Sequence, residues 1–94
     1  MRNPTISIIM PVKNAQNWLS ETIQSILSQT LEDWELVAID DHSEDSTWQV
    51  LNDFSISDQR IKCFKNKGNG IIPALRLAYS ISSGTFITRM DADD

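Results

Sequence analysis

Three carboxylates lie within four positions in the segment TFITRMDADD, at Asp91, Asp93 and Asp94. Carboxylates so close together repel one another and are costly to bury. The segment can be a solvated acidic loop, or it can hold a hard divalent cation, which prefers oxygen ligands. In an extended segment Asp91 and Asp93 point the same way, and Ala92 between them leaves room for a ligand. Such a metal site should lose affinity at low pH, because its ligands must be ionised.

A second pair of acids, Asp40 and Asp41, ends the apolar run WELVAID. Aspartates at this place can simply begin a turn or cap the next helix, an interpretation that weighs more for Asp40 than for Asp41. Asp41 can instead accept hydrogen bonds from a nucleobase edge or a ribose. His42 has no second histidine and no cysteine at ligand spacing, so we expect it to be an exposed loop residue.

The segments that must position these acids alternate between two periodicities. Four runs are β-branched and apolar, as in buried strands: TISIIMPV, WELVAID, RIKCF and TFITRMD. The three segments between them have the spacing of amphipathic helices. The second helix starts with a capping box formed by Ser46 and Gln49, and the third covers about 72–82. The first helix has its apolar stripe at Leu19, Ile23, Ile26 and Leu27.

This order of elements predicts an α/β fold, a three-layer, doubly wound and mostly parallel sheet with right-handed crossovers. No repeat, low-complexity segment or linker interrupts it, so we expect residues 1–94 to form a single domain. Ligands of such sheets bind beyond the carboxyl ends of the strands. The four strands deliver PVKN, DDHSED, KNKGNG and DADD to that edge. Asp41 and Asp91 are therefore expected on one rim, although 50 positions separate them.

No glycine-rich phosphate loop follows the first strand, where MPVKNAQNW contains no glycine. A bound diphosphate would therefore have to be neutralised in another way than by a G-x-G-x-x-G or Walker loop. A divalent cation held by DADD is the obvious substitute. Lys65 and Lys67 follow the third strand and can help to hold phosphates, although lysines around the Gly68-Asn69-Gly70 turn are common without any function.

The composition argues against several classes of function. A net charge of −5 disfavours binding to nucleic acid or to an anionic membrane, since both need basic surfaces. The apolar run Ile6–Val12 is too short to span a membrane, and no signal-peptide cleavage pattern follows it. The only cysteine, Cys63, can form no internal disulfide, and we expect a buried thiol in a reducing compartment. A cytoplasmic location follows. Three aromatic residues are expected to have packing roles: Trp18, Trp34 and Trp48.

The ordered set of motifs resembles the opening of the inverting glycosyltransferases of family 2, which have the GT-A fold. Members show a first strand ending in Pro-x-x-Asn, a helix ending in S-x-L-x-Q-T, then W/F-E-L and V-D-D-x-S-x-D. The corresponding segments here are PVKN, SILSQT, WEL and IDDHSED. The later NKG and the closing GTFITRMDADD fit the family's approach to its D-x-D motif, so the resemblance covers essentially the whole chain.

The resemblance implies a nucleotide-sugar donor, often UDP-linked, bound together with Mg²⁺ or Mn²⁺. It also implies strands in the order 3-2-1-4 and, in a full-length enzyme of bacterial polysaccharide synthesis, a saccharide or lipid-linked acceptor. Asp41 would read the base, Asp91 would face the ribose or sugar, and Asp93 would hold the metal with Asp91 beside it. The donor-binding positions carried over are Pro11, Val12, Asn14, Asp41, Lys67, Asp91 and Ala92.

The chain departs from the family pattern at Arg76, where the family often has Asn, and at His42, where it usually has Gly. Inverting sugar transfer also needs a general base, which in this family lies downstream of D-x-D, so no catalytic residue is assigned here. We expect a donor-binding fragment that starts at a natural Met1, stops after its metal motif and is inactive alone. Without further strands, Thr85–Met90 would be an unpaired edge that promotes a homodimer.

Two other functions remain open. A receiver-type signalling domain also combines an acid pair with a parallel sheet, but its pair normally follows the first strand, whereas here it follows the second. A non-catalytic nucleotide-binding module would bind the same ligands as the donor-binding fragment, and only the parent gene would distinguish the two.

Overall fold

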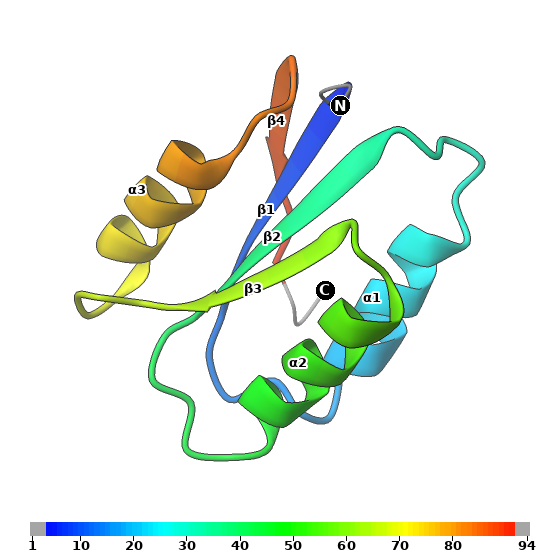
Figure 1. Ribbon diagram of the computed structural model, residues 1–94. Helices are drawn as coiled ribbons and strands as arrows, with labels where there is room; N and C mark the ends of the chain where they lie inside the picture. Colours follow the sequence, from blue (N-terminus) through cyan, green and yellow to red (C-terminus); the bar gives the residue numbers. More distant parts are fainter. Residues whose placement is uncertain (1–3, 92–94) are drawn as a thin grey trace.

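The computed structural model describes residues 4–91 as one four-stranded sheet with helices on both faces (Figure 1). All strand pairs are parallel, and the strands lie in the order β3-β2-β1-β4. Helix α3 covers one face, and α1 and α2 cover the other. The predicted fold class and strand order are confirmed. The elements are β1 (Ile6–Val12), α1 (Leu19–Leu27), β2 (Trp34–Asp40), α2 (Thr47–Ser57), β3 (Ile61–Lys65), α3 (Ile71–Ile81) and β4 (Phe86–Arg89).

The central strands carry the core because both of their faces are covered. Every residue of β2 is buried. Since successive side chains point to opposite faces, Leu36 and Ala38 pack in the cluster that includes α1 and α2. Val37 and Ile39 pack in the cluster that includes α3. The nearly continuous apolar character of WELVAID is thus the consequence of a strand with no solvent face.

Two helices contact the sheet through residues of different size. The apolar stripe predicted for α1 is confirmed, with Leu19, Ile23 and Ile26 at 0% exposure. Helix α3 instead buries Ala74 and Ala78 completely, and their small side chains let the helix lie close to β1 and β2.

The capping box predicted for α2 is wrong. Ser46 occupies the N-cap position without a side-chain capping bond, and Gln49 donates its Nε2 to Asp53 Oδ1 at 2.9 Å. The turn before α2 is organised by Asp45, whose Oδ1 accepts hydrogen bonds from the N–H (2.9 Å) and the hydroxyl (2.5 Å) of Thr47. An aspartate one residue earlier than expected therefore takes the capping function.

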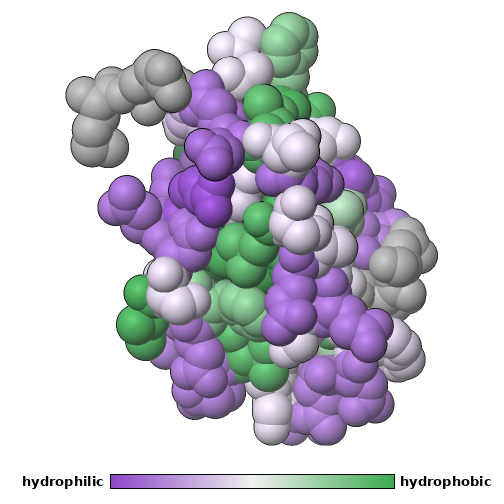
Figure 2. Space-filling view, turned by 90° about the vertical axis from the view of Figure 1, so that its right-hand side faces the viewer, coloured by the Kyte–Doolittle hydropathy of each residue, from purple (hydrophilic) through white to green (hydrophobic). Residues whose placement is uncertain are grey.

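The two edge strands are less buried than the sequence suggests. On β3, Cys63 is only partly buried rather than a core thiol, and all four residues of β4 are exposed, with Phe86 at 65%. An edge strand has only one strand neighbour, so its side chains have fewer neighbours than those of β1 and β2. On the side that carries α1, apolar side chains accordingly form a band between hydrophilic ones (Figure 2).

One buried acid ties the connection between α3 and β4 to the middle of the sheet. Glu35 is 2% exposed and accepts hydrogen bonds from the Ser7 hydroxyl (2.5 Å), the Ser83 N–H (2.7 Å) and Lys62 Nζ (2.8 Å). Gly84 donates its N–H to Ser7 Oγ at 2.7 Å, and a Cβ at Gly84 would lie 2.6 Å from that oxygen. The network sets where β4 begins beside β1.

Candidate functional site

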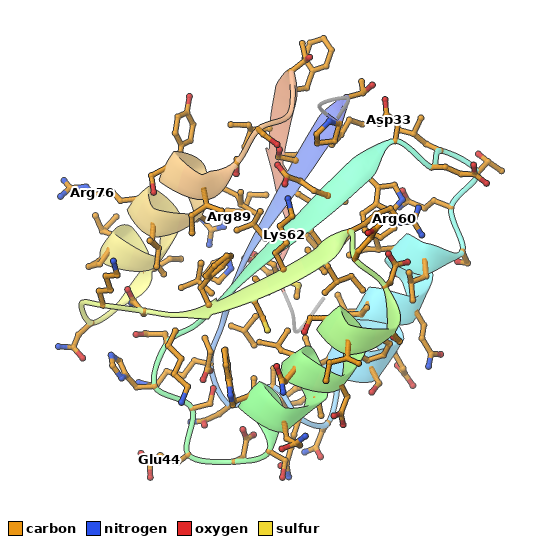
Figure 3. All side chains as sticks on the ribbon, viewed as in Figure 1. Asp33, Glu44, Arg60, Lys62, Arg76 and Arg89 are labelled. Carbon is orange, nitrogen blue, oxygen red and sulfur yellow. The ribbon has the colours of Figure 1, made fainter. Side chains whose placement is uncertain are left out.

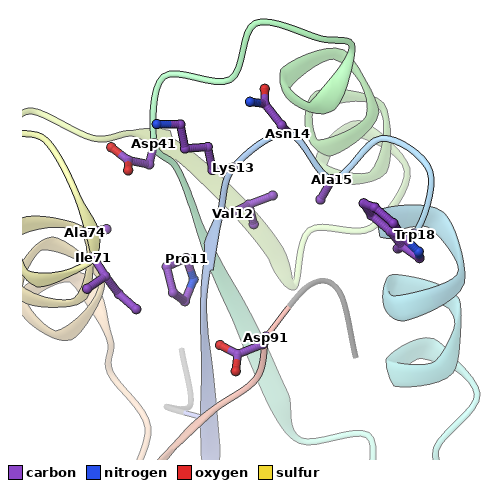
Figure 4. Close-up of a pocket in the computed structure, with 10 residues that line it drawn as sticks. All are labelled: Pro11, Val12, Lys13, Asn14, Ala15, Trp18, Asp41, Ile71, Ala74 and Asp91. Atoms are coloured by element: carbon purple, nitrogen blue, oxygen red, sulfur yellow. The ribbon is translucent and has the colours of Figure 1, made fainter.

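A pocket of about 240 Å³ opens at the carboxyl end of the sheet (Figure 4). It combines the end of β1 and the following loop, the residue after β2, the first turn of α3 and the segment after β4. The two acids expected on one rim, Asp41 and Asp91, both line it, as the topology predicts. The lining residues are Pro11, Val12, Lys13, Asn14, Ala15, Trp18, Asp41, Ile71, Ala74 and Asp91.

The loop after β1 is held in place by the loop after β2. Asn14 has a left-handed backbone (φ 50°), a conformation in which Asn is among the tolerated residues. Its N–H donates to Ser43 Oγ at 2.9 Å, and its side-chain oxygen accepts from the Glu44 N–H at 2.8 Å. The N–H of Ala15 donates to Thr47 Oγ1 at 2.8 Å. The backbone that faces the pocket is therefore fixed by polar contacts outside it.

Asp41 is oriented by two neighbouring segments. Its N–H donates to the Val12 carbonyl at 2.8 Å, which extends the β1–β2 ladder by one bond. Asn66 Nδ2 donates to Asp41 Oδ1 at 2.9 Å, and the Gly70 N–H lies 3.2 Å from both carboxylate oxygens. The Asn66 bond, with help from Gly70 and from the charge of Lys13, lowers the pKa of Asp41 against the opposing effect of desolvation. Asp41 is therefore an ionised acceptor at neutral pH.

The neighbours of Asp41 have structural roles. Asp40 is 3% exposed, and its Oδ1 accepts from the N–H (3.3 Å) and hydroxyl (2.5 Å) of Ser43, so it forms the turn that was the alternative to a binding role. His42 is exposed as predicted. Its backbone is left-handed (φ 57°), and its Nε2 lies 2.7 Å from the Gly68 carbonyl oxygen. His42 thus links the loop after β2 to the loop after β3.

Asp91 is the one residue of the predicted D-x-D motif that the structure describes; Ala92, Asp93 and Asp94 lie outside the described residues. The side chain of Asp91 is 44% exposed, and its Oδ1 contacts Arg89 Nε and a terminal guanidinium nitrogen, both at 3.2 Å. A carboxylate at a pocket is the kind of ligand that Mg²⁺ and Mn²⁺ prefer. Within residues 4–91 no group of three His, Cys, Asp or Glu side chains could hold a metal ion.

Lys65, the last residue of β3, and Lys67, in the loop after it, do not line the pocket. Lys67 is exposed, and the Lys65 ammonium lies 4.9 Å from the centre of the Trp48 ring. Arg76, the position that departs from the family pattern, is exposed on α3 and points outward (Figure 3). No contact therefore supports the prediction that Lys67 binds the donor.

Sequence reasoning missed several residues around the pocket. Lys13 follows directly from the segment PVKN delivered by β1, and it could have been included. Trp18 was expected only to pack, yet it is 48% exposed and lines the pocket. Asn66 and Gly70 contact Asp41 from another loop, and their only sequence signal is their position just after β3.

Residues 7–94 match the sequence model of Glycosyl transferase family 2. The chain belongs to glycosyl transferase family 2. This membership agrees with an acid pair after β2 rather than after β1, and it disfavours the receiver-type alternative.

Curated glycosyltransferases resemble the chain over nearly its whole length. An uncharacterised glycosyltransferase of Haemophilus influenzae is 41% identical over 92 residues, which cover 97% of this chain and 28% of the relative. The Escherichia coli UDP-Glc:alpha-D-GlcNAc-diphosphoundecaprenol beta-1,3-glucosyltransferase WfgD is 42% identical over 90 residues, covering 95% of this chain and 35% of the enzyme. The chain thus spans about a third of the length of these relatives.

The crystal structure of Staphylococcus aureus TarS 1–349 has the same fold, with a TM-score of 0.86 and 26% identity. The match covers 96% of this chain and 28% of TarS 1–349. Within residues 4–91, no helix is long and apolar enough to cross a membrane.

Proposed function

We propose that this chain binds the nucleotide-sugar donor of an inverting glycosyltransferase, with UDP as the nucleotide. The observation that carries the proposal is the shared pocket, which brings Asp41 from the end of β2 and Asp91 from the end of β4 together with the β1 loop. The relative WfgD, by its name, uses UDP-Glc, and this supports the choice of donor.

The pocket offers a donor molecule three kinds of contact: an ionised acceptor, a backbone segment and a positive charge. Asp41, an ionised acceptor, can bind N–H groups of a base or hydroxyls of a ribose. Pro11, Val12 and Asn14 belong to a segment whose backbone faces the cavity, and Lys13 supplies a positive charge there. A volume of about 240 Å³ is below the usual range for a pocket that encloses a whole ligand. We therefore assign it to the nucleoside part, with the sugar extending beyond it.

The donor's diphosphate would be neutralised by Mg²⁺ or Mn²⁺, with Asp91 and Asp93 as its ligands. The bound cation would stabilise the negative charge that develops on the leaving diphosphate. Asp91 fits this role by its place at the pocket, and the metal ion would replace the guanidinium of Arg89 as its partner.

We assign no catalytic residue to this chain. Inversion requires a base that deprotonates the attacking hydroxyl, and the family resemblance puts that base after the D-x-D motif. The acceptor, a saccharide or a lipid-linked saccharide such as the diphosphoundecaprenol substrate named for WfgD, would be bound by a longer protein. Residues 1–94 would thus form a donor-binding domain that does not transfer sugar alone.

Calorimetric titration with UDP, GDP and dTDP, each with and without Mn²⁺, tests this function. We expect the folded chain to bind UDP in a metal-dependent way, and weakly, because the pocket is open. Absence of binding to all three nucleotides would contradict the proposal. Sugar transfer by the 94-residue chain alone would contradict the assignment of the base to another segment.

A homodimer through the exposed edge, Thr85–Met90, is a further part of the proposal. Within residues 4–91, strand β4 pairs with β1 and has no strand on its other edge. Phe86 and Ile87 are exposed on this strand (65% and 36%).

We predict that Ile87→Lys abolishes concentration-dependent dimerisation, because a charge on an edge strand opposes pairing with a second strand. Ile56→Lys is the matched control, since Ile56 is 79% exposed on α2. Sedimentation velocity over a range of concentrations measures the effect. A wild-type chain that stays monomeric at high concentration, or equal dimerisation of both variants, would rule out this interface.

A further inference from the structure

Asn66 is a buried polar residue next to the pocket but not part of its lining. It follows β3 directly and is 4% exposed. Its N–H donates to the Asp40 carbonyl at 2.9 Å, which extends the β2–β3 ladder. The residue is thus held by the sheet, and its side chain lies between the loop after β2 and the loop after β3.

The side-chain amide of Asn66 is engaged on both of its polar atoms. Its Nδ2 donates to Asp41 Oδ1 at 2.9 Å and to the Gly70 carbonyl at 3.1 Å. Its Oδ1 accepts from the Gly68 N–H at 3.2 Å. An Asn side chain has two N–H donors and one carbonyl acceptor, so these three partners use both donors and the acceptor oxygen. Asn66 therefore bonds Asp41 and has no side-chain N–H left to donate to a ligand.

The loop that Asn66 organises delivers a second donor to the same carboxylate. Gly70 has φ 88°, a conformation that side-chain-bearing residues rarely adopt, and its N–H points to both oxygens of Asp41 at 3.2 Å. Gly68 packs against Pro73 so closely that a Cβ would lie 2.8 Å from the ring, and its carbonyl contacts His42. These contacts fix the loop 66–70 in the position from which the Gly70 N–H reaches the Asp41 carboxylate.

Asp41 retains acceptor capacity despite these bonds. A carboxylate has about four lone-pair sites, and the protein contacts are concentrated on Oδ1, with only the shared Gly70 N–H at Oδ2. The ionisable groups near it are Lys13 and its neighbour in sequence, His42, and Asp91 lines another part of the pocket. The protein thus holds the Asp41 carboxylate mainly through Oδ1, and Oδ2 keeps lone pairs that can accept hydrogen bonds from a ligand.

We infer that Asn66 is a positioning residue for nucleotide recognition: it holds the Asp41 carboxylate in the orientation that accepts hydrogen bonds from a nucleobase, without contacting the nucleotide itself. The inference rests on the proposed function of the pocket. It assigns the loop 66–70, which by its composition alone could be a turn without function, to the donor site.

A double-mutant cycle tests the inference, with UDP and inorganic pyrophosphate as ligands, both in Mn²⁺. Asn66→Ala should weaken UDP binding about tenfold, the loss of one hydrogen bond to a charged group, and should leave pyrophosphate binding within about twofold. In an Asp41→Ala background, Asn66→Ala should have no further effect on UDP. Equal weakening of both ligands would indicate a merely structural role. An undiminished effect in the Asp41→Ala background would indicate direct contact with the base, and both results would overturn the inference.

A ligand-free measurement separates this inference from the proposed function. The carboxyl ¹³C shift of Asp41, followed against pH, should show a higher pKa in Asn66→Ala than in the wild type, since the bond that mainly lowers it is lost. An unchanged pKa would overturn the inference even if UDP binds. If UDP does not bind, the proposed function fails, while a raised pKa would still support the positioning of Asp41. Asn66→Ser, which keeps a donor, should lie between the two and serves as the test variant if the alanine variant does not fold.

Discussion

Replacing Glu35 with alanine is expected to lower the free energy of unfolding by about 3 kcal/mol at neutral pH. The substitution removes a buried carboxylate and leaves the groups that donate hydrogen bonds to it without an acceptor. Glu35 is 2% exposed and accepts hydrogen bonds from Ser7, from the N–H and hydroxyl of Ser83, and from Lys62. Its removal leaves the Ser83 N–H and the Ser7 hydroxyl without their acceptor at the start of β4. Urea unfolding measures the loss.

The same contacts predict how stability depends on pH. Burial raises the pKa of Glu35, but hydrogen bonds from Lys62, Ser7 and Ser83 outweigh it and lower the pKa from 4.5 to about 2. Because the pKa is lower in the folded state, the contribution is complete above about pH 5 and is lost as the pH falls toward 2. A pKa shift of this size corresponds to about 3 kcal/mol of folding stability. We expect the wild type to lose this contribution as the pH falls from about 5 to 2.

Two variants make the pH prediction specific to Glu35. Glu35→Gln keeps the shape but not the charge, so its stability should change less than that of the wild type between pH 5 and pH 2. Glu21→Ala removes an exposed acid on α1 and should keep the wild-type pH dependence. Equal acid sensitivity of the wild type and Glu35→Gln would show that Glu35 is not the titrating group.

Asp41→Ala is expected to weaken UDP binding by about 10- to 100-fold while the chain remains folded. A hydrogen bond to a charged group contributes about 1.5–3 kcal/mol, which corresponds to this change in affinity. Asp41 is partly exposed at the pocket and has no part in the apolar core, so unfolding is not the expected result. Calorimetry in the presence of Mn²⁺ gives the affinity, and circular dichroism gives the fold.

The control for Asp41→Ala is Asp53→Ala, which removes one negative charge from the exposed face of α2. This variant should bind UDP like the wild type, because Asp53 does not line the pocket. Its side chain accepts a hydrogen bond from Gln49 on the same helix. If Asp41→Ala and Asp53→Ala have the same affinity for UDP, Asp41 does not contact the nucleotide.

Much of the fold could be predicted because its determinants are local. A strand covered on both faces needs a continuous apolar run, and WELVAID is buried at every position. A helix on a sheet needs a stripe, and Leu19, Ile23 and Ile26 form one. The rule that ligands bind at the carboxyl ends of parallel strands then brought Asp41 and Asp91 to one pocket.

The errors concern choices that the local pattern does not decide. Asp45 and Ser46 are both good helix caps, and only the position of Thr47 in space selects Asp45. Asn66 reaches Asp41 across two loops, a contact between distant segments that no periodicity reveals. Cys63 and Phe86 lie on the two edge strands, and the local pattern does not show which strands are edges, so both are more exposed than expected.

The most direct test of the donor-binding account is the affinity of the 94-residue chain for UDP, measured by calorimetry with Mn²⁺ and again after its removal with a chelator. The account predicts saturable binding with one site per chain, weaker by about tenfold or more without the metal. Folded protein that gives no binding heat with UDP in Mn²⁺, or the same affinity with and without the metal, would contradict it.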